Sequence, residues 1–145
     1  MWEKFAIELD TKCTEQKVDF FGLRDWILES VEKINERSFD YYISTGPSQE
    51  DRNQKIDVTI LLERRLYSFT VSQLAEIPLT PLKKEFSIFS LGDSIHYLEE
   101  TAKESITCTF ILGHLLSFFI TDSVTNSSKL REFAHKVLES AWGRQ

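Results

Sequence analysis

The sequence of 145 residues has few cysteines, no net positive charge and no long apolar run. Cys13 and Cys108 are its only cysteines, and neither has a second thiol or a histidine at ligand spacing, which argues against a cysteine-based metal site. A domain of this length buries roughly two-thirds of its unfolded surface, so it needs neither disulfides nor metals to fold. Cys108 lies in an alternating strand pattern and is predicted to be a small buried side chain.

The formal net charge of −6 removes any general attraction to phosphate backbones or anionic membrane surfaces. We therefore expect no nucleic-acid partner. The most apolar stretch, residues 106–120, is interrupted by threonine, glycine, histidine and serine and is shorter than the roughly 20 residues of a spanning helix. We expect no integral membrane segment. The first ten residues mix acids with apolar side chains, unlike a signal peptide, so the predicted location is cytoplasmic.

Local motifs of common enzymes are also missing from the sequence, including the glycine-rich phosphate loop, Gly-x-Ser-x-Gly, Cys-x-x-Cys and His-Glu-x-x-His. The densest titratable group is His96 with Asp93, Glu99 and Glu100, and a histidine beside carboxylates can act as a general base. Because strand side chains alternate, Glu99 is predicted to point away from His96 and Glu100, which divides the group. His96, together with His114 in a predicted turn, remains the candidate for a small enzyme, and no cofactor or metal is predicted.

Helical periodicity is clearest in a segment that begins at Asp19, a suitable N-cap residue. Phe21 and Leu28 flank its apolar stripe on one side and Trp26 flanks it on the other, so the helix is apolar over a wide arc. Residues 2–9 fit either a helix or a strand, and we favour a helix. The stripe itself consists of Phe20, Leu23, Ile27, Val31 and Ile34.

Short strand patterns fill the middle of the chain. The segment 77–82 contains two prolines and can hold only an edge or irregular segment, because proline cannot donate to a sheet ladder. Arg64 and Arg65 are predicted to form a solvated hairpin tip. The links between strands have hairpin lengths. The predicted strands cover residues 39–44, 56–62, 66–71, 85–91, 94–99, 105–112 and 115–121.

A closing amphipathic helix is predicted from Lys129 to Trp142. Asn126, Ser127 or Ser128 can cap its start, and Gly143 suits the left-handed position after its end. Its apolar face carries Leu130, Phe133, Ala134, Val137, Leu138 and Ala141.

The predicted fold is α+β, with an N-terminal helix, about seven mostly antiparallel strands forming a bent sheet or partly open barrel, and one C-terminal amphipathic helix. We expect one domain over residues 1–145, in which 1–37 form a helical addition and 39–142 form the sheet with its capping helix. The alternative is a nuclear-transport-factor-like cone, in which leading helices cover a curved sheet.

The strand order, the segment 77–80 leading into a strand, and the late Phe133 and Trp142 of the last helix carry a resemblance to the pleckstrin-homology-like superfamily, particularly its small bacterial members. The resemblance spans residues 39–142. It implies a partly open, strongly bent sheet with the last helix plugging one end. It also implies binding of phosphoinositides, peptides or proteins.

Lipid-binding members of that family place several lysines and arginines in and beside the first hairpin loop. The matching loop here offers Arg52 and Lys55 but also Glu50 and Asp51, so the sequence argues against lipid binding.

The leading functional hypothesis is a non-catalytic protein-interaction or structural module, because the surface is acidic, aromatic residues are abundant and no reactive constellation is present. Self-association is expected through an exposed sheet edge or the apolar flank formed by Phe21, Trp26 and Leu28. The alternatives are a module that binds a small molecule or lipid between sheet and helix, and a small enzyme near His96 or His114.

Overall fold

The computed structural model describes residues 1–16, 22–45, 53–74, 83–92, 94–113 and 115–143 of the chain. Its helices are α1 (Trp2–Glu15), α2 (Leu23–Ser30) and α3 (Ser127–Ala141), with 3₁₀ turns at Ile34–Glu36 and Val124–Asn126. Its strands are β1 (Asp40–Ser44), β2 (Asn53–Leu62), β3 (Arg65–Leu74), β4 (Lys83–Ser90), β5 (His96–Thr101), β6 (Ser105–Ile111) and β7 (Ser117–Ser123).

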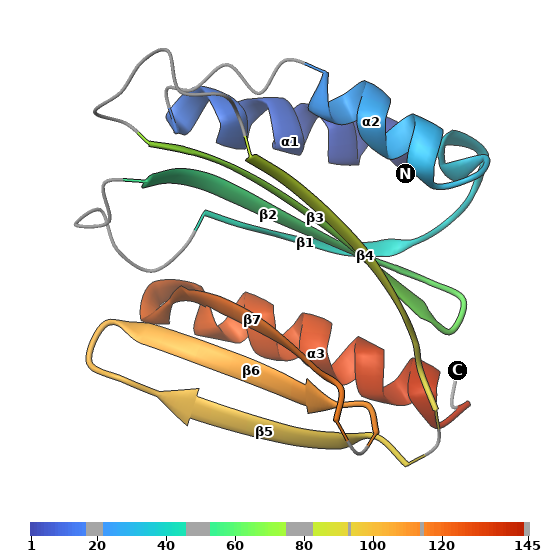
Figure 1. Cartoon of the computed structure of the whole chain (residues 1–145), viewed down its shortest axis with the longest axis vertical. Helices are drawn as coiled ribbons and strands as arrows, with labels where there is room; N and C mark the ends of the chain where they lie inside the picture. Colours follow the sequence, from blue (N-terminus) through green and yellow to red (C-terminus); the bar gives the residue numbers. More distant parts are fainter. Residues whose placement is uncertain (17–21, 46–52, 75–82, 93, 114, 144–145) are drawn as a thin grey trace.

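The strands form two antiparallel sheets, one in the order β1-β2-β3-β4 and the other in the order β5-β6-β7. Helices α1 and α2 lie on one side of the four-stranded sheet, while α3 and the three-stranded sheet lie on its other side (Figure 1). Helix α3 contacts β1, β6 and β7. The predicted α+β class, with an N-terminal helix, seven strands and a closing helix, is confirmed.

Two hydrophobic cores follow from this arrangement. Strict alternation along β2 places Ile56, Val58 and Ile60 on the side of α1 and α2, where each is fully buried. The second core surrounds α3, between the three-stranded sheet and the other face of the four-stranded sheet. It includes Cys108, whose predicted burial is confirmed by its 0% exposure.

Helix α1 confirms the helical interpretation of residues 2–9 and extends it to Glu15. Phe5, Ala6 and Leu9 are buried while Ile7 is 67% exposed, as helical spacing requires and strand alternation does not allow.

Helix α2 ends earlier than its periodicity predicts. Its last residue is Ser30, and Val31 is already extended at φ −118° and ψ 107°. Lys33 then adopts a left-handed conformation and starts the 3₁₀ turn. That turn returns Ile34 to the same core as Val31, so the apolar spacing is preserved without a continuous helix. Asp19 and Phe20, the predicted start of this helix, lie outside the described residues.

The predicted strands appear with small shifts, the largest in β2, which begins at Asn53 rather than Ile56, and in β3, which ends at Leu74 rather than Val71. Residues 77–82 lie outside the described part of the chain. Helix α3 is followed by Gly143 at φ 72°, in the left-handed conformation predicted for it. Asn126 occupies the N-cap position without a capping hydrogen bond, and its side-chain amide donates to Asp122 at 3.3 Å instead.

The β2–β3 turn is not simply a solvated tip. The Arg64 guanidinium donates to the Ala141 carbonyl at 2.7 Å, and the Ser140 hydroxyl donates to the Glu63 carbonyl at 2.6 Å. Arginine at a helix C-terminus satisfies a carbonyl that has no intrahelical partner. The turn therefore clamps the end of α3, which the local sequence around Arg64 did not indicate.

Candidate functional site

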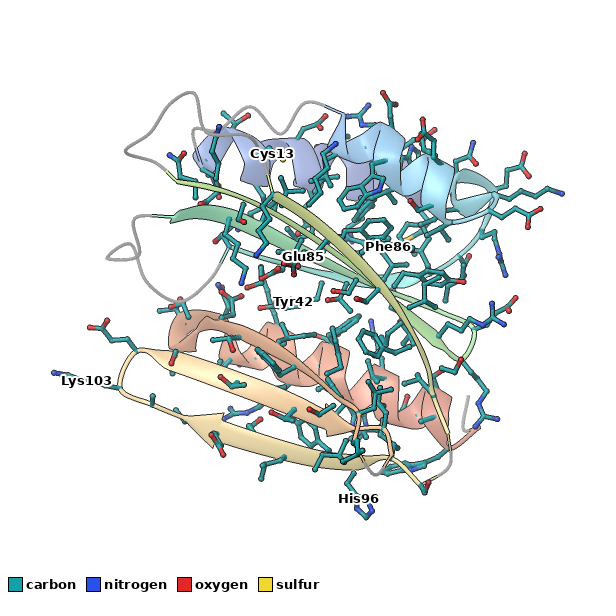
Figure 2. The ribbon with its side chains drawn as sticks, viewed as in Figure 1. Cys13, Tyr42, Glu85, Phe86, His96 and Lys103 are labelled. Carbon is teal, nitrogen blue, oxygen red and sulfur yellow. The ribbon has the colours of Figure 1, made fainter. Side chains whose placement is uncertain are left out.

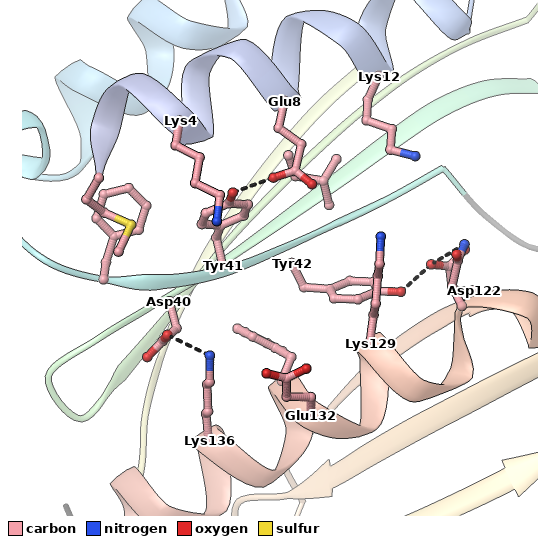
Figure 3. Close-up of a pocket in the computed structure, with 15 residues that line it drawn as sticks. Lys4, Glu8, Lys12, Asp40, Tyr41, Tyr42, Asp122, Lys129, Glu132 and Lys136 are labelled. Carbon is pink, nitrogen blue, oxygen red and sulfur yellow. Dashed lines mark hydrogen bonds and ion pairs between the residues drawn. The ribbon is translucent and has the colours of Figure 1, made fainter.

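An open groove of about 410 Å³ lies between α1 and α3, and it is lined along its length by Phe39 and the β1 residues Asp40 to Ile43 (Figure 3). The α1 wall presents Lys4, Glu8 and Lys12, which are four residues apart and therefore share one helical face. The α3 wall presents Lys129, Glu132, Phe133 and Lys136, again at the spacing of one face.

The floor of the groove is the free edge of the four-stranded sheet. Leu62 and Arg65 close a two-residue turn and form a hydrogen-bonded pair, so even-numbered residues of β2 bond to β3 and odd-numbered ones bond to β1. Tyr42 pairs with Thr59, an odd-numbered residue of β2, so its N–H and C=O groups point toward β2. The N–H and C=O groups of Tyr41 and Ile43 therefore face the free edge. Among the described strands, none pairs with this edge.

Two adjacent tyrosines set the width of the groove. The Tyr41 hydroxyl donates to the Glu8 carboxylate of α1, and the Tyr42 hydroxyl donates to the Asp122 carboxylate at the end of β7. Burial, followed by the neighbouring carboxylate, raises the pKa of both tyrosines well above its ordinary value. Both hydroxyls therefore stay protonated and act as donors.

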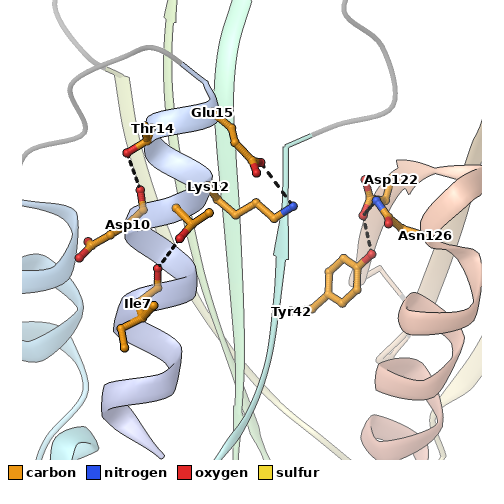
Figure 4. Close-up of polar contacts among 9 residues, drawn as sticks. Ile7, Asp10, Lys12, Thr14, Glu15, Tyr42, Asp122 and Asn126 are labelled. Atoms are coloured by element: carbon orange, nitrogen blue, oxygen red, sulfur yellow. Dashed lines mark hydrogen bonds and ion pairs between the residues drawn. The ribbon is translucent and has the colours of Figure 1, made fainter.

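Asp122 is 3% exposed, and its carboxylate accepts hydrogen bonds from three donors. Besides the bond from Tyr42 (Figure 4), it accepts hydrogen bonds from the Ser123 backbone N–H at 2.8 Å and from the Asn126 side-chain amide at 3.3 Å. A buried carboxylate needs such partners, because its desolvation is otherwise costly. Asp122 is therefore a structural anchor, with little capacity left for a ligand.

The groove is lined by four lysines and four carboxylates, namely Lys4, Lys12, Lys129 and Lys136 with Glu8, Asp40, Asp122 and Glu132. Asp40 pairs with Lys136 at 3.2 Å, and Lys12 pairs with Glu15 at 3.6 Å. Among the described residues, Lys4 and Lys129 make no ion pair, and Figure 3 shows them reaching toward β1 from opposite helices.

The residues predicted from sequence to form an apolar flank lie elsewhere. Trp26 packs edge-on against Phe69 at 5.1 Å between ring centroids, and the Lys84 ammonium lies 5.5 Å from the centre of the indole ring. Leu28 packs against the same core. Trp26 and Leu28 are thus half-buried between α2 and the sheet, while Phe21 lies outside the described residues.

The predicted lipid-loop residues are not assembled into a basic patch within the described chain. Lys55 pairs with Asp57 at 3.4 Å, and Asp57 also accepts from the Thr70 hydroxyl at 2.6 Å. Arg52 lies outside the described residues.

His96 points away from the molecule (Figure 2), on the exposed face of β5 that it shares with Glu100. Glu99 lies on the other face, where its bond to Arg131 at 2.9 Å lowers the pKa of the carboxyl group. Asp93 and His114 lie outside the described residues. Within the described ranges, no three His, Cys, Asp or Glu side chains are grouped so as to hold a metal ion.

Sequence reasoning missed Tyr41, Tyr42 and the lysines of the two walls. Two local signals were present: the repeat of Lys4, Glu8 and Lys12 on one helical face, and a pair of tyrosines in a short strand. Neither signal shows that the two helices face each other across β1.

Comparison with models of protein families, with curated protein sequences and with solved structures gives no match to this chain. None of the helices in the described part of the chain is long and apolar enough to cross a membrane.

Proposed function

We propose that this protein is a non-catalytic protein-interaction module that binds an extended segment of a partner protein along the free edge of β1. The observation that carries the proposal is the position of the Tyr41 and Ile43 backbone groups, which face a groove with a helix on each side. Unpaired edge groups accept another strand readily. In strand addition, main-chain hydrogen bonds supply affinity and flanking pockets supply specificity.

The charges of the walls define the chemistry of the segment. Successive side chains of an extended peptide point in opposite directions, so they would reach α1 and α3 alternately. Lys4 and Lys129 lie on opposite walls and have no described ion-pair partner. The proposed segment therefore carries two acidic residues at an odd sequence spacing. Because β1 has five residues, the paired segment is about five residues long.

The groove is set before any partner binds. The Tyr41–Glu8 and Tyr42–Asp122 bonds fix the two sides, and the Tyr42 ring packs against Phe133 with 5.9 Å between centroids. A preformed site lowers the entropic cost of ordering side chains on association.

We also propose that residues 39–142 form a pleckstrin-homology-like domain. The order of a four-stranded and a three-stranded antiparallel sheet followed by one helix supports this proposal. The resemblance implies peptide or protein binding, in agreement with the function proposed from the groove.

The test is selection of peptides from a random phage-displayed library on the purified protein, followed by fluorescence polarisation with the selected peptides. Ile43→Pro removes an N–H that faces the groove and leaves the β1–β2 ladder intact, so we expect binding to be lost. Lys129→Glu should weaken binding at least about fivefold, equivalent to roughly 1 kcal/mol.

Two matched variants serve as controls. Ile88→Pro makes the same change at an outward-facing position of β4, and Lys103→Glu reverses an exposed charge in the β5–β6 turn (Figure 2). Both should retain binding, and thermal melts should show that all variants fold. Failure to select any peptide, or binding that survives both Ile43→Pro and Lys129→Glu, would contradict the proposal.

A further inference from the structure

The other free edge of the four-stranded sheet is β4. Seven of its eight residues are exposed, the exception being the half-buried Phe89. Phe86 and Ile88 are 38% and 52% exposed, and alternation places them on the same face of the sheet. The edge thus combines unpaired backbone with two apolar side chains.

The direction of the backbone groups along β4 follows from one hydrogen bond. The Leu91 N–H donates to the Arg64 carbonyl at 2.9 Å, so the odd-numbered residues of β4 bond to β3. The N–H and C=O groups of Lys84, Phe86 and Ile88 therefore point outward, together with those of Ser90. No described strand pairs with them.

We propose that β4 pairs with β4 of a second copy of this chain, antiparallel about a two-fold axis at Ser87. The two sheets then become one continuous sheet with four strands from each copy. This interface is distinct from the groove at β1 and does not depend on the function proposed for it.

Charge selects this arrangement. A parallel, in-register pair would place Lys83, Lys84 and Glu85 opposite their own counterparts, and like charges directly opposite are destabilising. An antiparallel pair with its two-fold axis at Lys84 or Glu85 likewise places that charged residue opposite its own counterpart. With the axis at Ser87, Lys84 lies opposite Ser90 of the second copy and no like charges face each other.

The same register also pairs the apolar side chains. Phe86 lies opposite Ile88 of the second copy, and Ile88 lies opposite its Phe86, so the exposed apolar residues of the two chains form two neighbouring cross-strand pairs on one face. An axis at Phe86 would instead place Lys84 opposite Ile88. The strand is self-complementary at Ser87, which is the requirement of a two-fold interface.

Phe86 is already held in position. Its ring packs against Phe69 at 4.7 Å and lies 6.3 Å from the ring of Trp26. Natural edge strands avoid pairing mainly through charged residues and prolines. The charged residues of β4 are Lys83, Lys84 and Glu85. The rest of the strand, from Phe86 to Ser90, has no charged residue and no proline.

The first test is sedimentation velocity of the full chain from about 1 to 500 µM, a range that covers typical weak homodimers. We expect a dimer that dissociates on dilution. Ile88→Lys should shift the chain to monomer, because it places a lysine opposite Phe86 in each of the two apolar pairs. Leu98→Lys, at a 48% exposed position on the outer face of β5, is the matched control and should remain dimeric.

A monomeric wild-type chain at the highest concentration would overturn the proposal. A dimer that Leu98→Lys disrupts and Ile88→Lys does not would also overturn it, because that result places the interface on the three-stranded sheet. Both changes are at exposed side chains, so thermal melts should show folded variants.

The register is tested by crosslinking in a Cys13→Ser background. Residues 87 of the two copies lie directly opposite each other in a non-hydrogen-bonded pair, at a Cα separation of about 4.5 Å that a disulfide can span. Ser87→Cys should therefore form a crosslinked dimer on oxidation, and Glu85→Cys should not. Crosslinking of Glu85→Cys in place of Ser87→Cys would overturn the register. Peptide binding at β1 should be unchanged in Ile88→Lys, which separates the two proposals.

Discussion

Tyr41 and Tyr42 are adjacent in β1 and donate hydrogen bonds to carboxylates on opposite sides of the sheet. Tyr41 binds Glu8 on the α1 side, and Tyr42 binds Asp122 on the α3 side. Because successive strand residues point to opposite faces, a single short strand joins the N-terminal helix to the last strand. These two bonds hold the walls of the proposed peptide groove.

Tyr42→Phe should lower the free energy of unfolding by about 1–3 kcal/mol, because it removes one donor from the buried Asp122 carboxylate. Urea denaturation measures the change. Tyr67→Phe is the control, since Tyr67 is a half-buried tyrosine of the same sheet and no described residue accepts a hydrogen bond from its hydroxyl. An equal loss in the two variants would contradict the anchoring role of Tyr42.

Alkaline pH should destabilise the protein through the same tyrosine. Burial and Asp122 raise the pKa of Tyr42 in the folded state, whereas the unfolded chain has the ordinary value of about 10. The stabilisation is therefore complete below pH 10 and is lost as pH rises above that value. We expect the unfolding free energy to decline less steeply above pH 10 in Tyr42→Phe than in the wild type. Parallel profiles would contradict this assignment.

Arg64→Ala should destabilise the protein by about 1 kcal/mol through loss of its hydrogen bond to the Ala141 carbonyl. Arg65→Ala, at the next residue and also exposed, should change stability by less than about 0.5 kcal/mol. Ser140→Ala breaks the other half of the clamp, and the double variant Arg64→Ala/Ser140→Ala should show coupling. Additive effects would mean that the two bonds act independently.

Cys108 should resist thiol reagents while the protein is folded. Its side chain is fully buried, and burial raises the pKa of the thiol, which reduces the reactive thiolate. Reaction with a chromogenic disulfide should become fast only in denaturant. Each of the variants Cys13→Ala and Cys108→Ala keeps one cysteine, so comparing them shows which thiol reacts slowly. Rapid reaction of folded Cys13→Ala, in which only Cys108 remains, would contradict the prediction.

Local patterns were sufficient for most of the elements. Alternation of apolar residues located β2, β3 and β6 to within a few residues, and helical spacing located α3. For α1, residues 2–9 fitted a helix or a strand, and the favoured helix is confirmed and extends to Glu15. The end of α2 was mispredicted because Val31 and Ile34 keep a helical spacing although the chain between them is extended and then turns. Burial fixes which residues face the core, and a 3₁₀ turn satisfies that requirement as well as a longer helix does.

The groove could not be predicted in the same way. Glu8 and Tyr41 are 33 positions apart, and Tyr42 and Asp122 are 80 apart. Their meeting depends on β1 being an edge strand and on α1 and α3 lying on opposite sides of it. Single-sequence patterns report neighbours along an element and carry no information on such distant pairs.

The clamp at Arg64 has a consequence for the order in which the protein can fold. Helix α3 follows all seven strands in the chain, and its Leu130 and Val137 are fully buried in the core that it shares with both sheets. During synthesis, the strands emerge from the ribosome before this helix exists, and their apolar faces stay open until it arrives. Contacts between residues far apart in the sequence, such as Arg64 and Ala141 at a separation of 77 positions, form late and slowly. The nascent sheets therefore expose apolar surface until α3 is made, and such surface favours aggregation.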